Sequence, residues 1–268
     1  MFRYTKYLFF IALFMGMVAC GDDSTGPDVN PSEAPAFPQI LSEEMQPDFS
    51  FFEDNQPKNF ASNALAETNN YYGARNIALA NQFVFTFASI YTPLLLAGSA
   101  EEADFEDGMW VWEYSYNYEN KSVSVRVTAE EMANDYEWNM YWSYNDGETS
   151  VEDYKILEGI ISPDGKSGEW IFNTLDENTS EERIAYTSAW DITSDSEKMM
   201  DVNWYDENGE VGLSANYEAN QSDHLFNMLY TDEPDHSINW NSETNEGYHE
   251  SDGNQLCWDE SFQDIACD

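Results

Sequence analysis

Apolar and polar positions along the chain follow two periods, one typical of a helix and one typical of strands. The stretch 76–100 contains no charged residue, although the whole chain has 52 acidic and ten basic residues. Within it, apolar side chains recur at spacings of three and four residues, at Phe83, Phe87, Ile90, Tyr91 and Leu94. This is the spacing of one face of an α-helix. We therefore predict a buried helix over 76–100, inside a helical region that covers 59–100.

The stretch 76–100 is also long enough for a membrane span, for which about 20 apolar residues suffice. Several polar residues interrupt it, however, and Pro93 disfavours continuation of a helix. Arg75 is the only basic residue at its immediate flanks, whereas membrane spans usually carry more. We favour the buried helix, with the membrane span as the alternative.

From residue 108 to residue 251 the period changes to two, which is the period of a half-buried strand. About ten such segments follow one another, joined by polar turns such as Asn145-Asp146-Gly147. Short turns connect antiparallel neighbours. The sequence therefore predicts a mainly β domain, an antiparallel up-and-down meander of about ten strands that forms a curled sheet or partly closed barrel over the N-terminal helix. A two-sheet sandwich and an outer-membrane barrel are the alternatives.

The N-terminus has the pattern of an export signal. Arg3 and Lys6 precede an apolar run over 7–18, which ends in Met17-Val18-Ala19-Cys20. This stretch resembles the lipobox of bacterial lipoproteins, with methionine in place of the more usual leucine. The resemblance covers about the first 25 residues. It implies that 1–19 is a removed signal peptide, that Cys20 carries lipid such as palmitate, and that the protein is anchored to a membrane of the cell envelope.

Gly21, rather than aspartate, follows the cysteine, and among lipoproteins this implies the outer membrane. Whether the protein faces the periplasm or the cell surface stays open. Residues 20–58 are predicted to form a disordered tether behind the lipid, because six of the nine prolines lie there among small polar residues. Five apolar side chains are the exception and are expected to dock on the domain or on a partner, namely Ile40, Leu41, Phe49, Phe51 and Phe52. Residues 59–268 then form a single globular domain.

The net charge excludes some classes of partner. Two basic residues lie in the predicted signal peptide, which leaves eight of the ten against 52 acidic residues in the mature chain. Nucleic-acid binding needs basic patches and is excluded, and direct adsorption to anionic lipid is opposed. A salt-adapted, solvated surface is the interpretation we favour over cation binding, because the acidic loops 206–210 and 241–247 lack the ligand spacing of an EF-hand.

The two remaining cysteines lie at the C-terminus. Cys257 and Cys267 form an even pair in an exported chain, which predicts a disulfide that staples the segment 252–268. Zinc binding by the two thiols and a histidine is the alternative.

Candidate chemistry is sparse. His224, His236 and His249 are scattered near predicted turns, and neither a helical His-x-x-x-His pair nor a Gly-x-Ser-x-Gly motif occurs. With 52 acidic residues, some carboxylate pair always has the spacing that glycoside hydrolysis needs, so such a pair identifies nothing. We predict no catalytic residue, no cofactor and no metal ligand.

Aromatic residues offer the one feature with binding potential. The stripes 110–118 and 136–144 are expected to be core, whereas Tyr141 and Tyr205 point to the opposite face and are candidates for ligand contact. The predicted function is non-enzymatic binding of a glycan or a hydrophobic small molecule. A structural or protein-interaction lipoprotein of an envelope complex is the alternative, and a hydrolase is third. An apolar pocket beside 83–96 would favour the first class, and a filled core with a broad exposed face the second.

Overall fold

The computed structural model describes residues 34–37, 46–55, 69–85, 102–119, 121–175 and 182–267. Two α-helices in these ranges are α1 (Ser50–Asp54) and α3 (Asn70–Asn81). The strands are β1 (Asp104–Glu106), β2 (Met109–Tyr118), β3 (Lys121–Glu131), β4 (Tyr136–Asn145), β5 (Ser150–Ile161), β6 (Ser167–Leu175), β7 (Glu182–Ser194), β8 (Glu197–Tyr205), β9 (Val211–Asn220), β10 (Asp223–Tyr230), β11 (His236–Asn241), β12 (Gly247–Ser251), β13 (Asn254–Trp258) and β14 (Asp264–Ile265).

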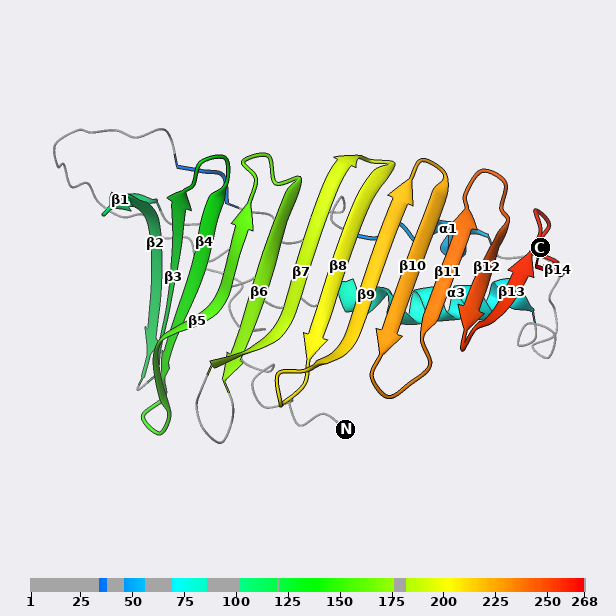
Figure 1. Ribbon diagram of the computed structural model, residues 1–268. Helices are drawn as coiled ribbons and strands as arrows, with labels where there is room; N and C mark the ends of the chain where they lie inside the picture. The colour runs from blue at the N-terminus through cyan, green and yellow to red at the C-terminus, as the bar shows by residue number, and fades with distance from the viewer. Residues whose placement is uncertain are drawn as a thin grey trace.

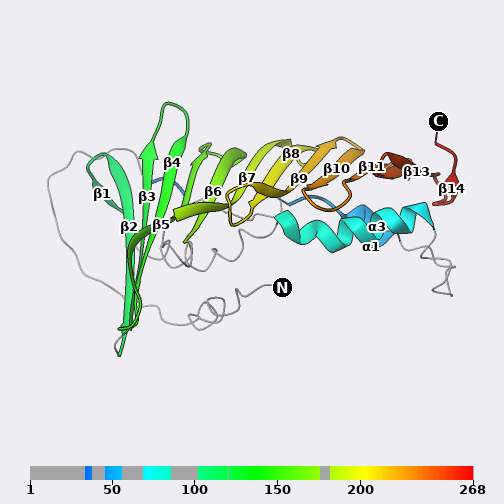
Figure 2. The same cartoon turned by 60° about the horizontal axis from the view of Figure 1, so that its bottom comes forward.

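All of these strands form one sheet, and their order in the sheet is their order in the sequence. The sheet has 14 strands, and each strand pairs with the next in antiparallel orientation (Figure 1). The predicted up-and-down meander is therefore confirmed. The sheet is open, with β1 and β14 as its two edges, and its twist turns the β1–β4 end relative to the β9–β13 end (Figure 2).

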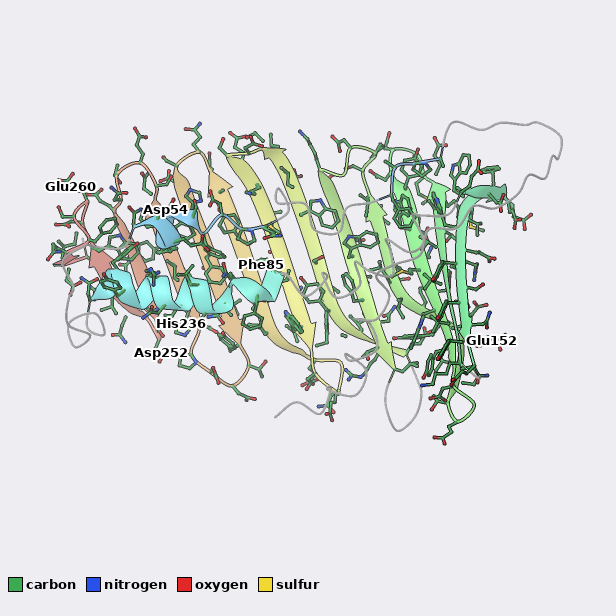
Figure 3. The ribbon with its side chains drawn as sticks, turned by 180° about the vertical axis from the view of Figure 1, so that it is seen from behind. Asp54, Phe85, Glu152, His236, Asp252 and Glu260 are labelled. Carbon is green, nitrogen blue, oxygen red and sulfur yellow. A yellow bond between two sulfur atoms is a disulfide. The ribbon has the colours of Figure 1, made fainter. Side chains whose placement is uncertain are left out.

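The register places large apolar side chains on one face across the whole sheet. One continuous row of paired residues runs from β2 to β10 and consists of Trp112, Val127, Met140, Leu157, Phe172, Tyr186, Trp204, Leu213 and Tyr230. The helices lie on this apolar face, which is turned toward the viewer in Figure 3. The opposite face carries the alternate residues of each strand, most of which are polar, with the exposed apolar residues Ile160, Met199 and Leu229 among them.

Three tryptophans on the apolar face cover glycines of the neighbouring strand. The paired residues are Gly159 with Trp170, Gly168 with Trp190, and Gly247 with Trp258. A Cβ atom at Gly159 would overlap both the ring of Trp170 and the backbone of Glu169. Glycine is needed there because an aromatic ring packs directly on the backbone.

The described helix α3 overlaps the start of the predicted helix 76–100, most of which lies outside the described residues. α3 begins at Asn70, where the side chain of Asn69 caps it by accepting a hydrogen bond from the Tyr72 amide at 3.2 Å. Its buried face consists of Tyr71, Ala74 and Ala78, and this face packs on the sheet at β12 and β13. None of the described helices is long and apolar enough to cross a bilayer.

The prediction that Phe83 belongs to the core is wrong. Its side chain is 59% exposed, whereas Val84 and Phe85, in the short helical turn after α3, are buried. The helix face is set by the small residues of α3, which allow close packing on the sheet, and Phe83 points away from that face. Phe87, Ile90 and the rest of 86–100 lie outside the described residues.

Part of the segment predicted as a tether is folded onto the apolar face. Phe49, Phe51 and Phe52 are buried in the same core as the sheet, and α1 contains two of them. Nearer the N-terminus, Phe37 packs on Trp112 and Trp138, with ring centroids 5.1 and 5.5 Å away. Of the two alternatives for these aromatic residues, the structure has docking on the domain. Ile40 and Leu41 lie outside the described residues.

Polar contacts to the backbone hold the docked segment in place. Lys198 Nζ donates to the Gln46 carbonyl at 3.0 Å, and Arg75 Nε donates to the Phe52 carbonyl at 2.7 Å. Two of the ten basic residues of the chain are therefore used to position this segment. Because backbone carbonyls accept these bonds, the two polar contacts depend on the path of the chain and not on the side chains of Gln46 and Phe52.

Both edges of the sheet are short and acidic, which opposes pairing with a further strand. At one edge, β1 has three residues, two of which are acidic. At the other edge, β14 has two residues. The predicted disulfide joins Cys257 in β13 to Cys267, just after β14, and holds this strand against its neighbour. Asp264 of β14 also accepts from the Asn70 amide at 2.9 Å, so the C-terminus is tied to the start of α3.

Candidate functional site

A shallow hollow lies on the polar face of the sheet, over β2–β5. We call it the serine hollow. Its volume is about 360 Å³, and its lining residues are Ser115, Asn117, Ser122, Val123, Ser124, Ser143, Tyr144, Asn145, Ser150, Val151 and Glu152. Glu152 is labelled in Figure 3 and marks this end of the molecule. Among the described residues, it is the larger of the two best-defined hollows.

Strand register explains why the surface is depressed at this place. One row of paired residues consists of Ser115, Ser124 and Ser143, on three successive strands. The next row toward the hairpin turns consists of Asn117, Ser122, Asn145 and Ser150. Short side chains on four adjacent strands leave space above the sheet. Hydroxyl and amide groups both donate and accept hydrogen bonds, so the floor suits a polar, uncharged ligand.

A row of larger side chains borders the serine hollow. In register these are Glu113, Arg126, Tyr141 and Lys155, on β2, β3, β4 and β5. The guanidinium carbon of Arg126 lies 4.3 Å from the centroid of the Tyr141 ring, and Lys155 Nζ lies 5.9 Å from it. Cations over an aromatic ring fix its orientation. Tyr141, which the sequence singles out for ligand contact, is therefore a half-buried and supported ring beside the hollow.

Both cations of this row also contact carboxylates. Arg126 lies 3.8 Å from Asp153, and Lys155 Nζ donates to Glu158 at 2.9 Å. The hydrogen bond to Glu158 raises the pKa of Lys155 above its ordinary value, so the ammonium group stays charged. Since each cation already has an acidic partner, the row offers little net positive charge to an anionic ligand.

An irregularity in the sheet shapes the border of the hollow. The pairing of β4 with β5 shifts register after Met140 and again after Trp142. On β5, Asp153 has a φ of 48° and its amide donates to Ser143 Oγ at 2.9 Å. Such bulges re-aim side chains. Alternating apolar residues do not reveal a bulge, so the sequence predicts neither the shift nor the hollow.

Tyr205 lies elsewhere on the polar face. It is half-buried in β8, and three strands separate it from Tyr141. The structure therefore does not bring the two candidate tyrosines together, and only Tyr141 adjoins a hollow.

The second hollow is acidic and lies at the β1 edge. It is about 190 Å³ in volume and is lined by Glu102, Asp104, Glu106, Val111 and Glu113. All four carboxylates are exposed. A catalytic acid of a glycosidase needs an apolar environment that keeps it protonated, and Val111 alone does not supply one. This hollow therefore gives no support to a hydrolase.

A second polar array on the same face is bonded to itself. Asn216 Nδ2 donates to Asp201 at 2.9 Å, and Asn227 Nδ2 donates to Asn216 at 3.3 Å. These side chains on β8, β9 and β10 satisfy one another and strengthen the sheet. They present fewer free donors than the serines of the hollow.

The three histidines lie on the apolar face. His224 is buried, its ring stacks on Trp240 with centroids 4.9 Å apart, and Nδ1 lies 2.9 Å from the Tyr217 hydroxyl. His236 Nδ1 lies 3.2 Å from His249 Nε2. Burial, with the neighbouring His236, lowers the pKa of His249 to about 4. The pairing of β11 with β12 brings these two residues together, and the sequence interpretation missed it because β12 has no clear apolar alternation.

In the part of the chain that the structure describes, no group of three or more His, Cys, Asp and Glu side chains is arranged to hold a metal ion. Cys20 lies outside the described residues, so its lipidation stays a prediction. Comparison of the chain with protein-family models, curated proteins and solved structures found no match.

Proposed function

We propose that this protein is a lipid-anchored, non-enzymatic module of a bacterial cell envelope that binds a neutral glycan in the serine hollow. The observation that carries the proposal is the hollow itself, with five serines and two asparagines beside the supported ring of Tyr141. Hydroxyl and amide groups match the hydroxyl groups of a sugar, and an aromatic ring gives an amphipathic platform for the apolar face of a sugar ring.

A glycan is a better ligand for this surface than a hydrophobic small molecule. An apolar ligand needs an apolar pocket. The face of α3 that packs on the sheet is fully buried, at Tyr71, Ala74 and Ala78. The two hollows described above are lined mainly by polar residues, so they suit a glycan better than an apolar ligand.

The proposed anchor would hold the domain close to an outer membrane. Cys20 precedes Ala34, the first described residue, by 14 residues. A chain of that length spans at most about 50 Å. The segment 34–37 docks near Trp112 and Trp138, at the end of the sheet that carries the serine hollow. The proposed anchor would therefore hold Ala34 within about 50 Å of the lipid, and the serine hollow would lie at the same end of the sheet, on its opposite face.

Binding to a glycan array, followed by calorimetry on each hit, tests the proposed function. Tyr141→Ala should weaken binding of a hit about tenfold, because an aromatic contact contributes about 0.5–1.5 kcal/mol and 1.4 kcal/mol is a factor of ten. Ser124→Tyr should abolish binding by filling the hollow. Tyr205→Ala is the matched control, since it removes the same side chain from another part of the same face, and it should bind like the unmodified protein.

Equal loss of binding in Tyr141→Ala and Tyr205→Ala would argue against this site, and an array without hits would argue against a glycan ligand.

The anchor is tested separately, since Cys20→Ser should release the protein from membranes and remove incorporation of a palmitate analogue. Membrane retention of that variant would contradict the lipid anchor without touching the glycan site.

A structural or protein-interaction role in an envelope complex is the second candidate. The broad exposed face of the sheet favours it, because such a face can hold a partner without any pocket. Cross-linking in intact cells from positions next to Tyr205, far from the hollow, would detect such a partner.

A further inference from the structure

The histidine pair lies between the sheet and the end of α3. His236 is the first residue of β11, and His249 is in the middle of β12. His249 is 6% exposed, whereas His236 is half-buried and lies beside α3 in Figure 3. Two imidazoles with facing nitrogens therefore form a small polar site inside an otherwise apolar face, with access from the solvent through His236.

The separation of the two nitrogens fits two ligands of one metal ion. Two nitrogens bound to one ion at about 2.0–2.1 Å lie about 2.9 Å apart in a tetragonal arrangement and about 3.3 Å apart in a tetrahedral one. His236 Nδ1 and His249 Nε2 are 3.2 Å apart. The ring planes are inclined by 33° and the centroids are 5.3 Å apart, so the rings lie side by side without stacking face to face.

Further polar groups gather at Tyr230, whose ring contacts that of His236. The ring of Tyr230 is 6.3 Å from that of His236 and nearly perpendicular to it. The Tyr230 hydroxyl lies 3.3 Å from Asn81 Oδ1 and 3.8 Å from Met228 Sδ. An amide oxygen from α3 and a thioether from β10 thus meet at the residue that contacts His236. A carboxylate also lies near this cluster, since Asp235, next to His236, accepts from the Tyr230 amide at 3.1 Å.

We propose that His236 and His249 form a two-imidazole binding site for a transition-metal ion of the Cu²⁺ type. Among divalent first-row ions, Cu²⁺ binds nitrogen ligands most tightly, whereas Mg²⁺ and Ca²⁺ prefer oxygen. Both nitrogens must be free of protons when the metal binds, and an imidazole next to another in a buried place favours its neutral form.

The competing explanation is a hydrogen bond between two neutral imidazoles, one donating and one accepting. The two explanations differ in what a metal does. A hydrogen-bonded pair alone gains no stability from Cu²⁺, whereas a metal site is stabilised by ligand binding to the folded state.

Titration of the purified protein with Cu²⁺ at pH 7.5 tests the proposal. Excess Mg²⁺ and a weak chelator are present, so that the many surface carboxylates do not take up copper. One ion should bind per chain, with nitrogen hyperfine structure in the electron paramagnetic resonance spectrum. His236→Gln and His249→Gln should each weaken binding at least about 100-fold, since loss of a direct ligand costs more than loss of a supporting residue. His224→Gln is the matched control and should bind copper like the unmodified protein.

Thermal melts keep the test decisive if His249→Gln folds poorly. Copper should raise the melting temperature of the unmodified protein and of His224→Gln, and should leave that of His236→Gln unchanged. His236 is only half-buried, so this variant is expected to fold. Equal copper affinity in the unmodified protein and both ligand variants, or equal loss in His224→Gln, would overturn the proposal.

Discussion

At the scale of single residues, close packing decides what a position tolerates. Gly159 in β5 and Gly212 in β9 are both strand glycines, but their surroundings differ. A Cβ atom at Gly159 would overlap the Trp170 ring and the Glu169 backbone, whereas at Gly212 the nearest atom is 3.9 Å away. Sequence alone does not separate the two, because the difference depends on the neighbouring strand.

Gly159→Ala should therefore destabilise the protein by about 1–3 kcal/mol, as overpacking of a core does. Gly212→Ala should be neutral or stabilise by up to about 1 kcal/mol, because alanine reduces the freedom of the unfolded chain. Denaturant melts of both variants measure the difference. If the two glycines respond alike, the ring of Trp170 does not pack tightly on β5.

The aromatic stripes show how far residue-level prediction reaches. The stripe 110–118 was expected to be core throughout, and Trp112 is indeed buried, but Tyr116 is 38% exposed and Tyr118 is 59% exposed. Alternation correctly assigns these residues to one face. Whether they are buried depends on what covers that face. Phe37 covers Trp112, and it lies in a segment whose composition predicts a tether, so the sequence does not indicate this cover.

At the scale of elements, hydrophobic pattern predicted strands better than helices. The ten predicted strands correspond to β2–β11, while β1, β12, β13 and β14 were missed because they are short and largely polar. The helix was placed where the chain is most apolar. In the described part of the chain, the small residues of α3 and the aromatic residues that precede it pack on the sheet, while 86–100, most of the predicted helix, lie outside the described residues.

Phe52 and Phe83 test this account of the core. Phe52→Ala should cost about 3–5 kcal/mol, because its side chain is fully buried between the ring of Trp240 and that of Tyr71. Phe83→Ala removes the same side chain from a position that is 59% exposed, so it should cost at least about 2 kcal/mol less. Equal losses in chemical denaturation would indicate that the segment 46–55 is not part of the core.

The interface between α3 and β12 should also respond to acid. The pKa of His249 is about 4 in the folded protein, against 6.5 for an ordinary histidine, because burial opposes its charge. The unfolded chain then binds more protons than the folded one, so the stability is complete above pH 6.5 and is lost as the pH falls toward 4. Carboxylates titrate mainly below this range.

With a chelator present, unfolding free energy should therefore fall between pH 6.5 and 5, and the fall should be smaller in His249→Gln. His236→Gln should also reduce the fall, but by less, because burial of His249 remains while the smaller contribution of His236 to its lowered pKa is lost. A pH profile in which His249→Gln parallels the unmodified protein would show that His249 is not held neutral.

At the scale of the whole molecule, charge is distributed very unevenly. After Lys198 the sequence contains 17 acidic residues and no lysine or arginine. This part of the chain provides β9–β14, so that end of the sheet lacks cations of its own. The sequence predicts this imbalance directly, since composition does not depend on the fold. The serine hollow, by contrast, depends on register between four strands and could not be predicted.

Salt should therefore stabilise the domain. The screening length rises from about 3 Å at 1 M salt to about 30 Å at 0.01 M, so repulsion among the carboxylates extends across several strands when salt is removed. The melting temperature should increase from 0.01 M to 1 M salt, and a gain of 2 kcal/mol would correspond to roughly 4–8 °C for a domain of this size.

Sodium and potassium chloride should act alike, because screening depends on ionic strength alone. CaCl₂ at matched ionic strength separates screening from specific cation binding, since a larger stabilisation by calcium would indicate ligation by the carboxylates. A melting temperature that does not change with sodium chloride would contradict a salt-adapted surface.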